Sequence, residues 1–268
     1  MIIHSYLTKG MLPWAKPYLK SLNYYHSGIK VILSTRDLDD KDIDLLHSYH
    51  GNLDIRNEPF NLDGLCLTSG KSISDIERYK YEIENKIVNE ENKIWKQFVS
   101  VEDRYRTSII EVFEECINLG GVLLHTDIDI FFKRPIHELI EFTSLHDISI
   151  KFRLNHNKEK RKVQGGVIGF KLKNEVLTFL YRWFYHIDKI PLIDKPIGYG
   201  QTSFYYAYKD MKQYYKWGDI PEKFISPRFD DDVIISAGNS KYGKEFILKY
   251  YNQQLKKMNS LSGRKFIL

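Results

Sequence analysis

The chain has 268 residues, of which 43% are hydrophobic and 14% aromatic, so it is long enough to bury a large core in one domain. Its formal net charge of +5 suits an anionic ligand such as a nucleotide phosphate, but is too low for a protein dedicated to duplex nucleic acid, so we expect no nucleic-acid partner. The N-terminus lacks the basic start of a signal peptide, and no segment approaches the ~20 apolar residues of a membrane span, so we expect a soluble, cytoplasmic protein.

The first sixty residues alternate between strand and helix patterns. Short apolar or β-branched runs predict strands at 2–8, 29–35 and 53–60, and helical spacing with turn signals predicts helices at 12–28 and 39–51. This alternation is typical of a mostly parallel sheet with helices on both faces, which places the chain in the α/β class.

Later segments continue the pattern with one interruption. Residues 74–99 are highly charged, with apolar residues at helical intervals, and predict a helical insertion on the surface. The other expected elements are a capped helix at 100–121, a basic loop at 153–163, a strand at 164–172, helices at 174–188 and 201–211, and a basic helix or tail at 242–268. No repeat or linker divides the chain, so we expect a single domain over residues 1–268.

The two cysteines, Cys66 and Cys116, fit neither a metal-ligand spacing nor a disulfide framework. We expect two buried thiols.

The chain contains five Asp-x-Asp pairs, and their contexts differ. Three lie in the polar stretch 37–44, where Asp commonly caps a helix, and a fourth lies at 230–232. Asp127 and Asp129 instead follow the apolar run 122–124, which an α/β architecture would bury. If the strand continues through them, their side chains project from one side, roughly 6.5 Å apart, at its carboxyl end, the edge where open α/β sheets bind ligands.

Two unpaired carboxylates beside a core lose hydration and repel each other, at a cost on the order of several kcal/mol. A divalent cation removes that cost. Because Mg²⁺ and Mn²⁺ prefer oxygen ligands and often complete their shell with substrate phosphates, Asp127 and Asp129 are candidates to hold a cation and, through it, a diphosphate.

The segment from Tyr105 to Ile136, with a capped helix, Gly-Gly, an apolar strand, Asp-x-Asp, two aromatic residues and Pro-Ile, resembles the nucleotide-sugar-dependent glycosyltransferases of the GT-A fold. Glycogenin-like and lipopolysaccharide sugar transferases are the members it resembles, and the resemblance runs from about Ile2 to Lys241. It implies a single Rossmann-like GT-A domain, Mn²⁺ or Mg²⁺ on Asp127 and Asp129, a nucleotide-sugar donor, UDP-linked by default, and a glycan or lipid-linked acceptor.

The resemblance also implies roles for further residues. Residues 164–171, with Gly165 and Gly166, look like the strand on the sugar side of the donor pocket, and Gln201 is similar to the Gln of a downstream Asp-Gln segment, although Gly200 replaces the Asp. By the same resemblance the catalytic residues are Gln201 and Asp129, and the donor-binding residues are Tyr6, Leu7 and Thr8 near the base, Arg106 and Lys241 near the diphosphate, and Asp127, Gly165 and Gly166.

The third metal ligand departs from the family pattern, because Ile235 stands where those transferases have His. Water could replace that ligand, as could one of Ser236, Asn239, Asp230, Asp231 and Asp232. His125 shares the strand face of the acidic pair, but we expect a core histidine there, because imidazole is not the usual partner of a cation held by carboxylates.

No carboxylate stands out as the base that inversion of configuration needs, since none of Asp188, Asp194 and Asp219 has a distinguishing context. Because the segment from Gln164 to Gly166 and Gln201 also resemble those of the retaining members of the family, we expect a retaining enzyme.

Two other functions are compatible with parts of the sequence. A haloacid-dehalogenase-like phosphatase also places Asp-x-Asp after an apolar strand, but it usually has Thr or Val where this chain has Phe131. A relative that binds nucleotide sugars without turnover is the other alternative, suggested by Gly200 and Ile235. The basic C-terminal segment either packs on the domain or makes a peripheral contact with an anionic membrane.

Overall fold

A computed structural model describes residues 1–36, 38–58, 72, 74, 77–78, 81, 108–189, 199–226, 233–237 and 243–261. Its centre is a seven-stranded sheet in the order β3-β2-β1-β4-β7-β6-β8. The strands are β1 (Ile2–Thr8), β2 (Lys30–Arg36), β3 (Leu53–Glu58), β4 (Val122–Thr126), β6 (Ile148–Phe152), β7 (Val163–Lys171) and β8 (Trp217–Asp219).

Strands β1 to β4 are parallel to one another, as are β6 and β8, whereas β7 runs antiparallel to both β4 and β6. The predicted mostly parallel α/β sheet is therefore confirmed, and the reversed β7 is a feature that the pattern did not predict. A second, smaller sheet has the order β5-β10-β9, with β5 (Ile130–Phe132), β9 (Ile225–Ser226) and β10 (Ile235–Ala237).

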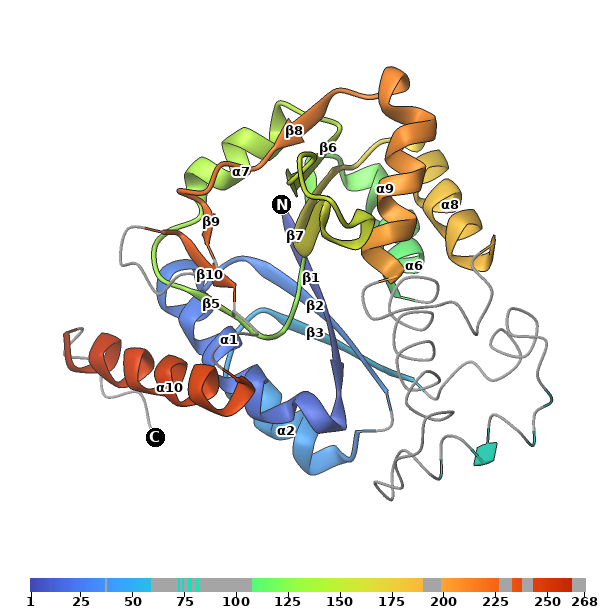
Figure 1. The fold of residues 1–268 in the computed structure, drawn as a ribbon. Coiled ribbons are helices and arrows are strands. Elements are labelled where there is room, and N and C mark those ends of the chain that lie inside the picture. Colours follow the sequence, from blue (N-terminus) through green and yellow to red (C-terminus); the bar gives the residue numbers. More distant parts are fainter. Residues whose placement is uncertain are drawn as a thin grey trace.

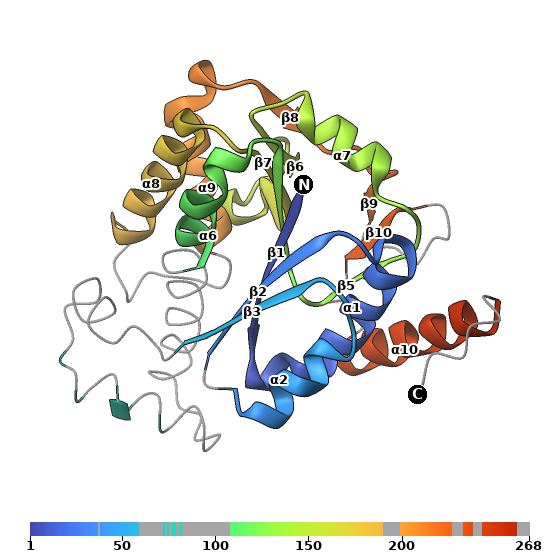
Figure 2. The same ribbon diagram turned by 180° about the vertical axis from the view of Figure 1, so that it is seen from behind.

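Helices cover both faces of the large sheet (Figures 1 and 2). One side carries α1 (Leu12–His26), α2 (Asp40–His47), α7 (His137–Ser144) and α10 (Lys244–Leu261). The other carries α6 (Ile110–Cys116), α8 (Asn174–Lys189) and α9 (Tyr199–Met211). Short 3₁₀ turns are η1 (Lys9–Met11), η3 (Ile117–Leu119), η4 (Glu159–Arg161) and η6 (Lys212–Tyr214).

The alternation of side chains along each strand divides the core into two clusters. In β1, Ile3 and Leu7 join the cluster under α1 and α10, whereas Ile2 joins the cluster under α6 and α8. In β4, Leu124 and Leu123 divide in the same way. These two strands are therefore buried on both faces, as their apolar runs predicted.

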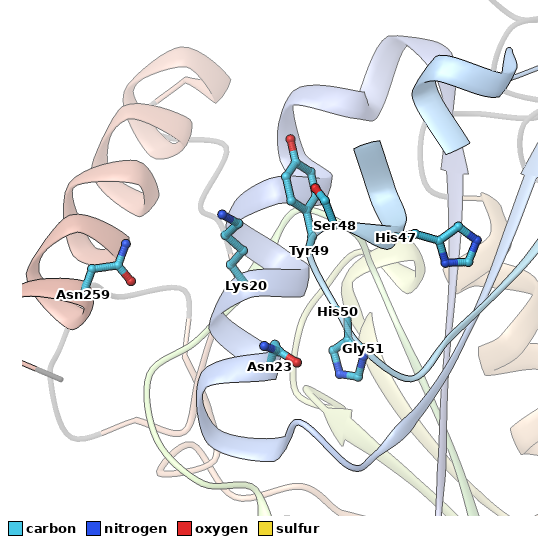
Figure 3. A pocket seen from close by; sticks show the side chains of 8 residues that line it. All are labelled: Lys20, Asn23, His47, Ser48, Tyr49, His50, Gly51 and Asn259. Carbon is cyan, nitrogen blue, oxygen red and sulfur yellow. The ribbon is translucent and has the colours of Figure 1, made fainter. Parts of the chain in front are cut away.

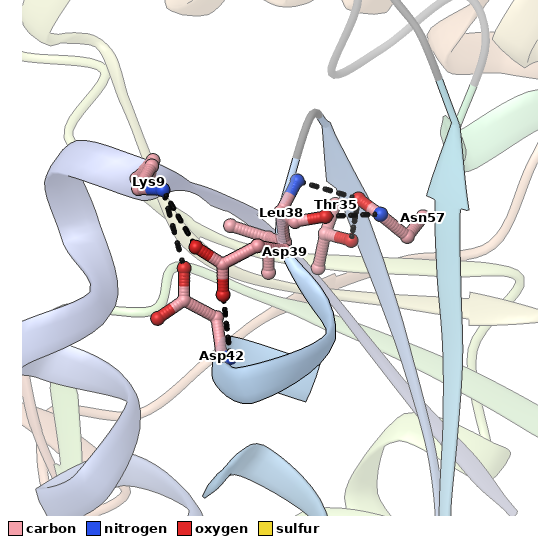
Figure 4. Close-up of polar contacts among 6 residues, drawn as sticks. All are labelled: Lys9, Thr35, Leu38, Asp39, Asp42 and Asn57. Atoms are coloured by element: carbon pink, nitrogen blue, oxygen red, sulfur yellow. Dashed lines mark hydrogen bonds and ion pairs between the residues drawn. The ribbon is translucent and has the colours of Figure 1, made fainter. Parts of the chain in front are cut away.

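The start of α2 shows the expected structural use of an Asp-x-Asp stretch (Figure 4). The Asp39 carboxylate caps the helix by accepting the Asp42 N–H at 3.0 Å, and Lys9 pairs with both carboxylates at 3.1 and 3.6 Å. Leu38, which precedes Asp39, is held by Asn57 of β3. The Asn57 amide accepts a hydrogen bond from the Leu38 N–H at 3.0 Å and donates one to the Leu38 carbonyl at 2.8 Å. These aspartates thus have partners within the protein.

Other expectations concern single segments. Cys116 is buried as predicted. Cys66, nearly all of the 74–99 insertion and the first turns of the 100–121 helix lie outside the described residues. The strand 164–172 and the helices 174–188 and 201–211 correspond to β7, α8 and α9, and α10 lies within the predicted C-terminal helix. No described helix is long and apolar enough to cross a membrane.

Candidate functional site

Buried hydrogen bonds from β1 and α1 fix the carboxyl end of β4. Thr126, its last residue, is fully buried; its carbonyl accepts a hydrogen bond from Ser5 at 2.8 Å, and its hydroxyl bonds to that of Tyr18 at 2.7 Å. Buried polar groups need such partners, and here they fix the backbone immediately before Asp127.

The acidic pair lies beyond β4, in the turn that leads to β5, and not within the strand. The expectation that the strand continues through Asp127 and Asp129 is therefore wrong. The chain has to leave the large sheet here in order to enter the small one. Burial still alternates along this turn, because Asp127 and Asp129 are half-buried while Ile128 between them is only 4% exposed.

Residues from three distant segments meet at this point. The Asp127 N–H donates to the Gly166 carbonyl at 2.9 Å, which ties the acidic pair to β7. A methyl group built on Gly165 would lie 3.6 Å from Cγ and 3.7 Å from Nε2 of Gln201, so the Gln201 side chain lies directly over Gly165. The structure thus brings together Asp127, the two glycines and Gln201.

A register shift in β7 shapes the same place. Ile150 of β6 is opposite Ile168, but the next residue, Lys151, is opposite Gln164, so within the described strands Gly165, Gly166 and Val167 have no partner residue in β6. Such irregularities re-aim a strand and commonly occur beside active sites. Here the shift frees one edge of the glycine backbone next to Gln201.

Asp129 lies near the start of the small sheet and α10. Burial raises the pKa of the Tyr251 hydroxyl, and the negative charge of Asp129 adds to that shift. This hydroxyl donates to the Ser236 carbonyl at 2.7 Å, and the Tyr251 ring stacks on Phe131 with centroids 5.2 Å apart. Ser236 is fully buried beside Tyr251, with its hydroxyl 3.3 Å from the Tyr251 oxygen.

The ends of β1 and β2 form the region expected to border a nucleotide base. The Tyr6 side chain lies on the same face of the sheet as that of His125. Leu7 is fully buried in the cluster on the opposite face, and Thr8 is half-buried. Only the backbone of Leu7 could therefore border a ligand on the Tyr6 side of the sheet.

Arg36, the last residue of β2, is a candidate that the sequence analysis missed. Its guanidinium lies 5.9 Å from the Tyr6 ring centroid and donates to the Thr35 carbonyl at 3.0 Å, although the residue is only 3% exposed. Glu58 of β3 lies 3.8 Å from it. A buried arginine at the carboxyl edge of a sheet is a ready partner for an anionic or planar ligand.

The expectation for His125 is confirmed. It is fully buried and its Nδ1 lies 3.0 Å from Nδ1 of His4, whose Nε2 is 3.1 Å from the Ser34 hydroxyl. One histidine of the pair must donate and the other accept, so this contact joins β1 to β4 beneath the site.

The remaining predicted residues lie away from this point or outside the described residues. Arg106, Lys241, Asn239, Asp194 and the 230–232 aspartates lie outside the described residues. Asp188 is in α8, and its side chain is also outside them. Asp219 lies on the edge strand β8, where it accepts the Phe152 N–H at 3.0 Å and lies 3.7 Å from Lys151. That strand is three positions from β4 in the sheet order.

Within the described ranges no group of three or more His, Cys, Asp or Glu side chains forms a metal-binding cluster. A pocket of about 200 Å³ lies elsewhere, at the amino ends of β2 and β3 (Figure 3). It is lined by Lys20, Asn23, His47, Ser48, Tyr49, His50, Gly51 and Asn259. It is therefore at the sheet edge opposite to Asp127.

No protein-family model matches the sequence, and no curated protein matches it. Solved structures do match the fold. The galactosyltransferase LgtC, solved with donor and acceptor sugar analogs, aligns with a TM-score of 0.56 at 10% identity over 94% of this chain and 96% of that chain. An active-site variant of LgtC, with glutamine changed to glutamate, gives a TM-score of 0.53 at 10% identity over the same shares of the two chains.

The glycosyltransferase GlyE of Streptococcus pneumoniae TIGR4 aligns with a TM-score of 0.59 at 10% identity, over 97% of this chain. The match covers 64% of GlyE, so this chain spans less than two thirds of that protein. Identities this low carry information about the fold alone. The fold expected from the sequence is confirmed: the chain has the α/β fold of the GT-A glycosyltransferases.

Proposed function

We propose that the chain is a glycosyltransferase that moves a sugar from a nucleoside diphosphate donor, with UDP as the expected nucleotide, to a glycan or other acceptor. The observation that carries this proposal is the convergence of Asp127, Gly165, Gly166 and Gln201 at the carboxyl edge of the sheet. These residues come from three separate segments of the sequence, and the family resemblance assigns all of them to one donor site. LgtC, which shares the fold, was solved with donor and acceptor sugar analogs.

The chemistry of the acidic pair fits a divalent cation. Asp127 and Asp129 are two half-buried carboxylates in one short turn, and carboxylate oxygens are the ligands that Mg²⁺ and Mn²⁺ prefer. They would hold the cation, whose charge would offset that of the departing diphosphate. The backbone bond from Asp127 to Gly166 keeps this turn beside the glycine segment.

The expected order of the donor along the sheet follows the strand order. The base would lie by Tyr6 and Thr8, with Arg36 as an added candidate; the diphosphate would lie at the end of β4, and the sugar over Gly165 and Gly166. Arg106 and Lys241 remain proposed diphosphate contacts.

Gln201 is the residue that we expect to face the reacting sugar carbon, with Asp129 as the other catalytic candidate. An active-site glutamine in LgtC supports the choice of residue type. Its amide carries both a donor and an acceptor, which suits the support of a charged intermediate without general-base chemistry. We therefore propose retention of configuration.

A haloacid-dehalogenase-like phosphatase is not favoured, because the structural relatives are glycosyltransferases. A silent nucleotide-sugar binder would bind donor without hydrolysis or transfer.

The C-terminal helix packs on the domain, which is one of the two alternatives expected for this segment, because Ile247, Tyr251 and Leu255 of α10 are buried against the domain.

The outward side of α10 supports a peripheral contact with anionic lipid as well. It carries Phe246, 53% exposed, and the exposed residues Lys249, Lys256 and Lys257. Co-sedimentation with phosphatidylserine vesicles tests this contact, and equal recovery with neutral vesicles would contradict it.

The test of the main proposal is a panel of nucleotide sugars incubated with Mn²⁺, with donor hydrolysis and the anomer of the product followed by NMR. We expect hydrolysis or transfer from one donor, dependent on the cation. Release of phosphate from phosphomonoesters, with no turnover of any nucleotide sugar, would refute it.

A further inference from the structure

A basic and aromatic surface lies beside Gln201, on the side away from β4. It is formed by the loop between β6 and β7 and by α9, which lie against each other in Figure 1. We call it the platform and define it by Arg153, Lys162, Tyr205, Tyr208 and Lys209. Tyr205 and Tyr208 follow Gln201 by one and two turns on the same side of α9.

The platform is joined to the candidate site through direct contacts. The Arg153 guanidinium donates to the side-chain oxygen of Gln164 at 2.8 Å, and Gln164 precedes the glycine over which Gln201 lies. Since the sheet order runs from β2 through β4 and β7 to β6, the platform lies beyond the proposed sugar position, on the side opposite to the base and the diphosphate.

Positive charge gathers around one ring of the platform. The Lys162 ammonium lies 5.4 Å and the Lys209 ammonium 5.2 Å from the Tyr205 ring centroid. The negative face of a tyrosine ring attracts each ammonium group, but the two like charges repel each other. An anion bound next to them would relieve that repulsion.

A single carboxylate, that of Glu159, offsets only part of the positive charge of the platform. In the described part of the loop, Glu159 is the only acidic residue, against the basic residues Arg153, Lys158, Lys160, Arg161 and Lys162. Glu159 pairs with Lys209 at 3.7 Å and accepts a hydrogen bond from Tyr206. Lys162 instead donates to the Leu154 carbonyl at 2.9 Å, and Arg153 to a neutral amide, so both charges keep neutral partners among the described residues.

We propose that the platform binds the acceptor and selects one whose sugar carries a negative charge, as a carboxylate, sulfate or phosphate. The Lys162 and Lys209 ammonium groups recognise the charge, and Tyr208, stacked beside Tyr205 with centroids 6.2 Å apart, supports the ring that holds them. This inference rests on the proposed function, because it assigns a substrate class to the same site.

The experiment compares two acceptors of the same shape, methyl glucoside and methyl glucuronide, with the donor that the panel identifies. The variant carries Lys162→Gln and Lys209→Gln, which remove both charges and keep most of each side chain. Lys41→Gln on α2, exposed and on the other side of the sheet, is the matched control. Donor hydrolysis without acceptor is measured for every protein.

We expect the wild-type protein to use the glucuronide with a kcat/KM at least about tenfold above that for the glucoside. The double variant should lose about five- to tenfold on the glucuronide alone, since each exposed charge contributes a small free energy and the two free energies add. Raising the salt concentration should reproduce the loss. The rate of donor hydrolysis in the double variant, and both acceptor rates in the Lys41→Gln control, should equal those of the wild-type protein.

Equal use of the two acceptors by the wild type, an equal loss on both in the variant, or donor hydrolysis without transfer to the glucuronide would overturn the inference. Failure of the proposed function gives a different result, namely no binding or hydrolysis of any nucleotide sugar by the wild-type protein.

Discussion

Replacement of Gly165 by alanine separates a functional role of the glycine segment from a structural one. The added methyl would meet Gln201 at 3.6 and 3.7 Å, which are ordinary contact distances, and Gly165 does not have a positive φ. The folded protein should therefore accept the change, and we expect the free energy of unfolding to move by no more than about 0.5 kcal/mol.

The same methyl projects from the glycine segment toward Gln201, at the border of the place where the donor sugar is proposed to lie. One extra methyl group in a fitted pocket costs about 1–3 kcal/mol of transition-state binding, so kcat/KM should fall roughly 10- to 200-fold. Thermal unfolding and the rate of donor turnover, measured on one preparation, check both halves of the prediction.

Gly169→Ala is the matched control, four residues further along β7. A methyl there would lie 2.6 Å from Cγ2 and 3.0 Å from Cβ of Thr143, which is itself buried. Overpacking of this kind costs about 1–3 kcal/mol, or roughly 2–6 °C in Tm. The reasoning fails if Gly165→Ala is as unstable as Gly169→Ala, or if it is stable and turns over the donor at the wild-type rate.

Four further variants test other parts of the structure. Asp127→Ala and Asp129→Ala should each abolish turnover and its dependence on Mn²⁺ while the circular dichroism spectrum is retained; cation-dependent turnover in either variant would remove the acidic pair from the site. Tyr251→Phe should lower the free energy of unfolding by about 1 kcal/mol in urea titrations, because the Ser236 carbonyl loses its 2.7 Å bond to a buried hydroxyl. Burial, and then the charge of His137, lowers the pKa of His26, whose Nε2 accepts the Ile136 N–H at 2.8 Å. Since the folded pKa lies below the unfolded value of about 6.5, this part of the stability is complete above pH 6.5 and is lost as the pH falls through that value toward the folded pKa. The decrease in Tm between about pH 7.5 and pH 5.5 should be smaller in His26→Gln, and an identical decrease in both proteins would contradict this role.

The candidate residues could be chosen from the sequence, but their proximity could not. Asp127, Gly165 and Gln201 each stood out by context or by family resemblance, yet nothing in the linear chain says that the Asp127 N–H bonds to Gly166. That contact requires β7 to run antiparallel to β4. Arg36 gave no signal, because an arginine at the end of a strand has the same appearance in sequence whether it is solvated or buried against Tyr6.

The acidic pair shows the same limit within a few residues. Strand geometry predicted two carboxylates on one side of a continuing strand, whereas β4 ends at Thr126 and the pair occupies the turn to the small sheet. The end of the strand is set by a non-local event, since β5 pairs with β10 and that strand comes more than a hundred residues later.

The sequence by itself determined the local elements and the class of fold, because hydrophobic periodicity and turn residues act over a few neighbouring positions. It thereby determined β1 to β3, α1, α2, α8 and α9. Only the tertiary structure decided the reversed β7, its shifted register and the contacts of Gly165 with Gln201. These depend on which strand edges meet after the core is buried, and that choice is made by packing across the whole chain.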